Sequence, residues 1–85
     1  MKVTNAQELA SHGVDLCDSL SWQLRGACND SNLPAVQRIA AAINTVALLC
    51  ADDLDDRPHM TDINFNVLAW TATEVHDRAA RTLED

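Results

Sequence analysis

The stretch that decides the fold is residues 32–51, with the sequence NLPAVQRIAAAINTVALLCA. Its apolar residues fall on two adjacent sides of a helix. One side carries Val36, Ala40, Ile43, Ala47 and Cys50, and the other carries Ala35, Ile39, Ala42, Val46 and Leu49. Arg38 is its only charged residue. A helix that is apolar over so wide an arc packs against two neighbours or a second subunit, so the stretch predicts a central helix.

The residues at the two ends of this stretch set the expected helix bounds at 33–51. Asparagine is a favoured N-cap and proline is tolerated in the first turn, so Asn32 and Pro34 mark the start. Aspartates follow residue 51, and carboxylates are unfavourable at a helix C-terminus because it carries partial negative charge. Pro58 lacks a backbone donor and makes continuation of the helix costlier still.

An amphipathic helix is predicted before this stretch, over 5–29. Thr4 can cap it, with Gln7 reaching back as in a capping box. Its apolar residues recur every three or four positions, as on one face of a helix. They are Leu9, Gly13, Leu16, Leu20, Leu24 and Ala27.

Another helix is predicted after the stretch, over 62–83, with Thr61 or Asp62 as its cap. Its apolar stripe consists of Phe65, Leu68, Ala72, Val75, Ala79 and Leu83. Glu74–Arg78 and Asp77–Arg81 are expected to form i,i+4 ion pairs on its exposed face. Because short loops between long helices favour antiparallel neighbours, the sequence predicts an all-α fold, an antiparallel three-helix bundle.

The size and charge of the chain restrict its partners. The chain has 85 residues and a formal net charge of −7 at pH 7, which fits a single domain over 1–85. Small domains gain core by oligomerising, so a homodimer is expected. An acidic chain repels phosphate backbones, so no direct nucleic-acid binding is expected. The most apolar run, 39–51, is too short for a membrane span, and the odd cysteine number without a secretory signal favours the cytoplasm.

Two tryptophans depart from the apolar stripes. Trp22 lies about 200° around the helix from Leu20, and Trp70 about 200° from Leu68. Ile63 and Val67 share the side of Trp70 and form a second apolar strip with it. Three interpretations are open: the rings cover the edge of the core, the residues form a self-association surface, or they bind a different protein. As partner-binding or dimer residues we name Trp22, Ile63, Val67 and Trp70.

The chain also contains an acidic cluster, DDLDDRPH, at residues 52–59. It resembles the D-D-x-x-D magnesium-diphosphate motif of isoprenoid synthases over five residues, but their second acidic motif is missing. A calcium-binding EF-hand loop is excluded, because Arg57 and Ile63 stand where the loop needs glycine and glutamate. A solvated turn, weak divalent-cation binding and an epitope for a basic partner remain as interpretations. No metal site is predicted, and the candidate partner-binding acids are Asp52, Asp53, Asp55 and Asp56.

No other pattern supports catalysis. Asp18-Ser19-Leu20 resembles the phosphopantetheine site of acyl carrier proteins, yet Ser19 falls midway along a predicted helix rather than at a helix start. His76 and Asp77 are sequence neighbours, which do not face each other on a helix. Zinc ligands could come from Cys17, Cys28, Cys50 and His59, but no C-x-x-C pair occurs, so buried structural thiols are predicted. The chain is therefore expected to be neither an enzyme nor dependent on a cofactor.

In size, charge and helicity the chain resembles the short acidic regulators that bacterial viruses use against host machinery, among them anti-CRISPR proteins. The resemblance implies that the four aspartates stand in for phosphates against a basic groove. The sequence thus predicts a small acidic protein-binding regulator or inhibitor, acting on a basic, nucleic-acid-handling protein. The alternative is a homo-oligomeric structural or assembly subunit without a foreign partner. An acyl-carrier-like or metal-binding protein is a third reading.

Overall fold

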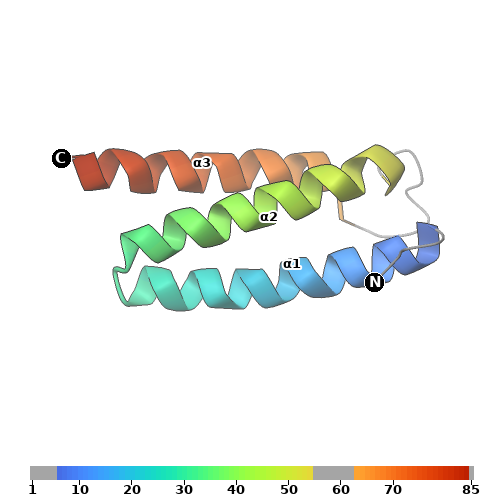
Figure 1. The fold of residues 1–85 in the computed structure, drawn as a ribbon, viewed down its shortest axis with the longest axis horizontal. Helices are drawn as coiled ribbons and strands as arrows, with labels where there is room; N and C mark the ends of the chain where they lie inside the picture. Colours follow the sequence, from blue (N-terminus) through green and yellow to red (C-terminus); the bar gives the residue numbers. More distant parts are fainter. Residues whose placement is uncertain (1–5, 55–62, 85) are drawn as a thin grey trace.

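Three long helices make up the computed structural model, which describes residues 6–54 and 63–84. They are α1 (Ala6–Asn29), α2 (Leu33–Leu54) and α3 (Phe65–Glu84). They pack antiparallel, and α2 crosses obliquely between the other two (Figure 1). α2 packs against both α1 and α3, whereas α1 and α3 make few contacts with each other. The predicted all-α, antiparallel three-helix fold with a central second helix is confirmed.

The predicted start of α2 is confirmed, and the helix ends three residues beyond its predicted end near residue 51. The Asn32 side-chain Oδ1 accepts a hydrogen bond from the Ala35 N–H at 3.4 Å, as an N-cap does. At the other end, α2 continues through the first aspartates to Leu54 instead of ending at residue 51. Ala51 is buried in the core. We attribute the extension to this burial, which offsets the roughly 0.3–1 kcal/mol that a carboxylate costs at a helix C-terminus.

The connection between α1 and α2 is a Schellman turn. The Asn32 N–H donates to the Ala27 carbonyl at 2.9 Å, and the Ser31 N–H donates to the Cys28 carbonyl at 3.1 Å. Ser31 has φ 55°, the left-handed conformation that this turn requires and that glycine adopts most easily. The tight turn brings α2 back antiparallel to α1.

α3 begins at Phe65, three residues later than the sequence predicts. Its cap is Asn64, whose Oδ1 accepts a hydrogen bond from the Val67 N–H at 3.1 Å. Thr61 and Asp62, the caps expected from the sequence, lie outside the described residues, as does Thr4.

The core is built mainly from small side chains. A first cluster holds Ala10, Cys17, Ala47, Cys50, Ala51, Phe65 and Ala69. A second holds Ala27, Val36 and Ala79. Small residues let helix backbones approach closely, so the seam between α1 and α2 runs over Ala10, Gly13 and Cys17. Three leucines assigned to the apolar stripes are exposed: Leu16 (48%), Leu49 (65%) and Leu83 (47%).

A polar link joins α2 to α3. The Asn44 side-chain amide donates to the Ala69 carbonyl and to the Thr73 hydroxyl, each at 2.8 Å. The Thr73 hydroxyl itself donates to the Ala69 carbonyl at 3.1 Å. A link of this kind fixes the register of two helices whose other contacts are mostly apolar.

Candidate functional site

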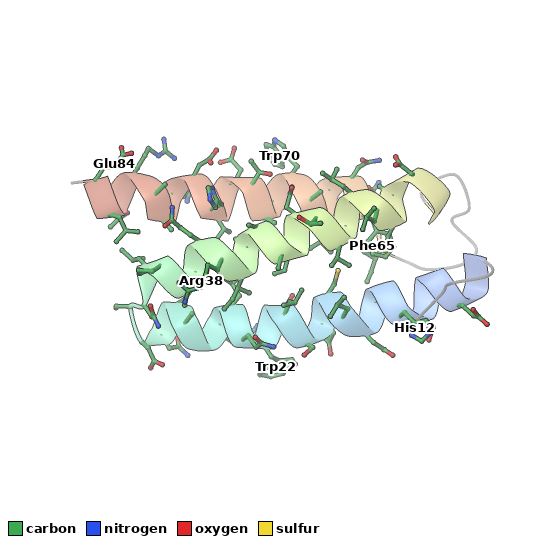
Figure 2. The ribbon with its side chains drawn as sticks, viewed as in Figure 1. His12, Trp22, Arg38, Phe65, Trp70 and Glu84 are labelled. Carbon is green, nitrogen blue, oxygen red and sulfur yellow. The ribbon has the colours of Figure 1, made fainter. Side chains whose placement is uncertain are left out.

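The two tryptophans project from opposite sides of the molecule (Figure 2). Trp22 points outward from α1 and is 65% exposed, and Trp70 points outward from α3 and is 67% exposed. The interpretation that the rings cover the edge of the core is therefore wrong for both. Self-association and binding to another protein both remain open, but one flat partner cannot cover both rings.

The exposed strip on α3 is smaller than the sequence predicts. Val67 is 58% exposed and lies one turn from Trp70. Ile63, by contrast, is half-buried and packs against the first core cluster, so its assignment to the surface is corrected. We call Val67 and Trp70 the α3 strip. It lies opposite the buried residues of the same helix, with the exposed Glu74 one turn further on.

Trp22 has a more polar environment. The Arg25 guanidinium carbon lies 5.2 Å from the centroid of its ring, a cation–π contact. Asp15 and Asp18 are exposed on the same helix. Ser19 is exposed in the middle of α1 as well, which is not the helix-start position of the carrier-protein serine.

The acidic cluster is described only in part. Asp52 is exposed in the last turn of α2. Asp53 belongs to the same helix, while Asp55 and Asp56 lie outside the described residues. The role of these four aspartates as a partner-binding epitope stays a prediction. The described residues contain no group of three or more His, Cys, Asp or Glu side chains that could hold a metal ion.

The charged face of α3 differs from expectation. His76 Nδ1 lies 3.2 Å from Asp77 Oδ1, within hydrogen-bonding distance, although neighbouring helical residues were not expected to meet. The Glu74–Arg78 and Asp77–Arg81 pairs do not form. The hydroxyls near His76 donate to backbone carbonyls, Thr45 to Ala41 and Thr73 to Ala69, so neither donates to the imidazole.

The cysteines are separated along the bundle. Cys17, Cys28 and Cys50 form no disulfide with one another. Cys17 and Cys50 are buried in the first core cluster, and burial raises the pKa of the Cys17 thiol. Cys28 is exposed, which corrects the prediction that all three are buried. The structure does not bring the three thiols together, and His59 lies outside the described residues.

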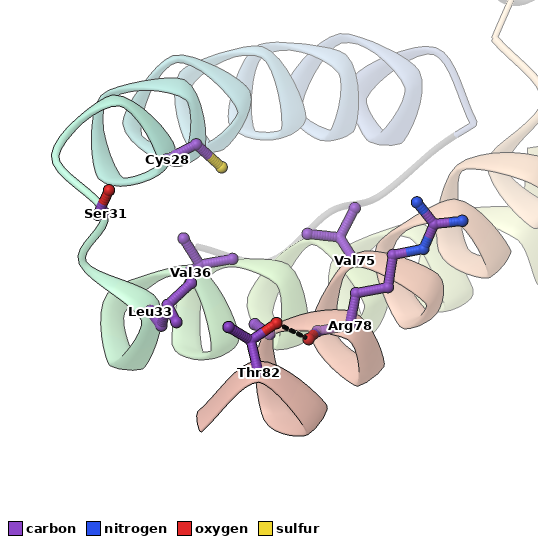
Figure 3. Close-up of a pocket in the computed structure, with 8 residues that line it drawn as sticks. Cys28, Ser31, Leu33, Val36, Val75, Arg78 and Thr82 are labelled. Carbon is purple, nitrogen blue, oxygen red and sulfur yellow. Dashed lines mark hydrogen bonds between the residues drawn. The ribbon is translucent and has the colours of Figure 1, made fainter. Parts of the chain in front are cut away.

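The sequence did not predict a groove that the structure places at the end of the bundle near the α1–α2 turn. Its volume is about 520 Å³. Cys28 lines it from α1, Leu33 and Val36 from α2, and Val75 and Arg78 from α3 (Figure 3). Ser31, Ala79 and Thr82 complete the lining. The groove lies between helices that make few contacts with each other, α1 and α3, so it is a feature of tertiary packing with no local signal in the sequence.

The helix α2 has the length and apolar composition of a membrane-spanning helix. The segment Leu33–Asp52 is long and apolar enough by length and composition alone. The apolar run 39–51 lies inside this longer helix. The same helix packs against α1 and α3, and the core helix of a small bundle has this composition as well.

No family model, curated protein or solved structure matches the chain.

Proposed function

We propose that the protein is a non-enzymatic regulator that binds another protein through the α3 strip. The observation that supports this most is the exposure of Trp70, 67%, beside Val67, 58%, on the side of α3 that faces away from the core. Tryptophan is the residue type most enriched in binding hot spots, and a paired aliphatic neighbour is typical of a contact surface.

The charge of the chain favours a basic partner. The net charge is −7, and Glu74 and Asp77 are exposed further along α3. The acidic segment that begins at Asp52 leads in sequence directly to α3. A basic, nucleic-acid-handling protein would offer complementary charge to these carboxylates and an apolar contact for the indole. From the cysteine usage of the sequence we place the site of action in the cytoplasm.

The test compares two tryptophans of nearly equal exposure. A tagged pull-down from bacterial lysate uses the wild type, Trp70→Ala, Trp22→Ala and a variant with Asp52, Asp53, Asp55 and Asp56 changed to Asn. We expect a basic partner that is retained by Trp22→Ala and lost from Trp70→Ala and the Asn variant, and that binds the purified wild type directly. Retention of the partner by all variants would contradict the proposal.

A homo-oligomeric subunit is the second candidate. Leu48 and Leu49 are 49% and 65% exposed on α2, in addition to the α3 strip. Small domains often cover such residues by self-association. Sedimentation equilibrium distinguishes the regulator from the homo-oligomeric subunit. The subunit would be favoured if the protein forms an oligomer that Trp70→Ala does not dissociate and if no foreign partner is found.

A further inference from the structure

The groove near the α1–α2 turn combines an apolar lining with one cation. Leu33, Val36 and Val75 present aliphatic side chains to it, and Arg78 is the charged residue in its lining. Arg78 extends from α3 past Val75, so that its guanidinium and Cys28 lie on opposite sides of Val75 (Figure 3). A few polar groups in an apolar concavity between helices are typical of a site for a small organic ligand.

Arg78 is available to such a ligand. The expected partner Glu74 does not pair with it, and it forms no ion pair with any carboxylate in the described ranges 6–54 and 63–84. The Thr82 hydroxyl donates to the Arg78 backbone carbonyl at 2.9 Å, not to its side chain. A guanidinium carries donors in a planar fork that matches a carboxylate.

The size of the groove fits a small ligand. Its volume, about 520 Å³, falls within the roughly 300–1,000 Å³ typical of small-ligand pockets.

We propose that this groove binds a free aliphatic monocarboxylate, with the alkyl chain against Leu33, Val36 and Val75 and the carboxylate paired with Arg78. The net negative charge of the chain opposes an approaching anion at long range, but salt screens charges beyond about 8 Å. The pairing with Arg78 acts at contact. This ligand site is independent of the function proposed for the α3 strip.

Cys28 supplies a direct readout, because it is the exposed cysteine and lines the groove. The probe is decanoate, held below its micelle concentration, and the signal is the rate of Cys28 alkylation by neutral iodoacetamide, followed by intact mass. We expect decanoate to slow alkylation in a saturable way. Octanoate should bind about 15-fold more weakly, because each buried methylene contributes about a fourfold factor.

The matched variants are Arg78→Ala and Arg81→Ala, since Arg81 lies on the same helix and does not line the groove. We expect Arg78→Ala to weaken protection about tenfold or more and Arg81→Ala to leave it unchanged, with circular dichroism confirming the fold of each. Three results would overturn the proposal: no protection, equal protection by a decyltrimethylammonium cation, or protection that depends on protein concentration without ligand, which would indicate a second copy in the groove.

Discussion

Gly13 on α1 and Cys50 on α2 lie so close that a Cβ on residue 13 would come within 2.5 Å of the Cys50 Sγ. The same Cβ would lie 3.8 Å from the Phe65 ring, at Cζ. Glycine is unfavourable inside a helix. At position 13 its missing Cβ lets side chains of the other two helices approach α1 closely. Phe65 and Cys50 are both fully buried, and both side chains lie next to this position.

This contact predicts opposite effects for the two glycines of α1. Gly13→Ala should destabilise the fold by about 1–3 kcal/mol, because overpacking forces Cys50 or the helices to shift. Gly26→Ala should stabilise it by about 0.5–1 kcal/mol, because nothing lies within 4 Å of the added Cβ and alanine favours the helix. Thermal unfolding followed by circular dichroism checks both. If Gly13→Ala were as stable as Gly26→Ala, the close packing described here would be wrong.

The hydrogen bonds of Asn44 predict a second effect on stability. Asn44→Ala removes both bonds from α2 to α3 and should cost about 1–2 kcal/mol, or about 4–16 °C in Tm for a domain of this size. Thr45→Ala is the matched control, because the Thr45 hydroxyl bonds only within its own helix, to the Ala41 carbonyl. It should be close to neutral. Equal losses in the two variants would show that the link to α3 contributes nothing specific.

The left-handed conformation of Ser31 predicts that glycine at this position stabilises the fold. Ser31 has φ 55°, a conformation that costs a residue with a Cβ about 1–2 kcal/mol relative to one without. Ser31→Gly should therefore raise Tm by several degrees, whereas Ser31→Val should lower it. Ser21→Gly is a suitable contrast: it places glycine in the middle of α1 and should lower Tm.

The sequence predicted what depends on local pattern. The broad apolar arc of residues 33–51 identified α2 as the central helix, and Asn32 identified its start. The helical phase of Val67 and Trp70 correctly placed them away from the core. The prediction that Leu16 faces the core is wrong. Cys17 is buried in its place, and which of these two neighbours is buried depends on how closely α2 approaches α1.

The parts that could not be predicted arise between helices. The groove follows from the sparse contact of α1 with α3 and has no signal in either helix alone. Arg78 looked like half of an i,i+4 pair with Glu74, yet its side chain lies at the groove instead. Ile63 shares the phase of Trp70 but precedes the first residue of α3, Phe65, so helical spacing does not apply to it.

The cysteines predict an ordered alkylation pattern. In the native protein, iodoacetamide should modify Cys28 first, because it is exposed, while Cys17 and Cys50 are buried. Only the thiolate reacts, and burial raises the pKa of Cys17. The raised pKa of Cys17 also makes stability depend on pH. The buried, protonated thiol contributes fully below the pKa of an unfolded cysteine, and this contribution is lost as the pH rises through the raised pKa of the folded state. Intact mass should therefore show one rapid addition at neutral pH and three in denaturant. Peptide mapping should assign the rapid addition to Cys28, and rapid native labelling of Cys17 would contradict the core described here.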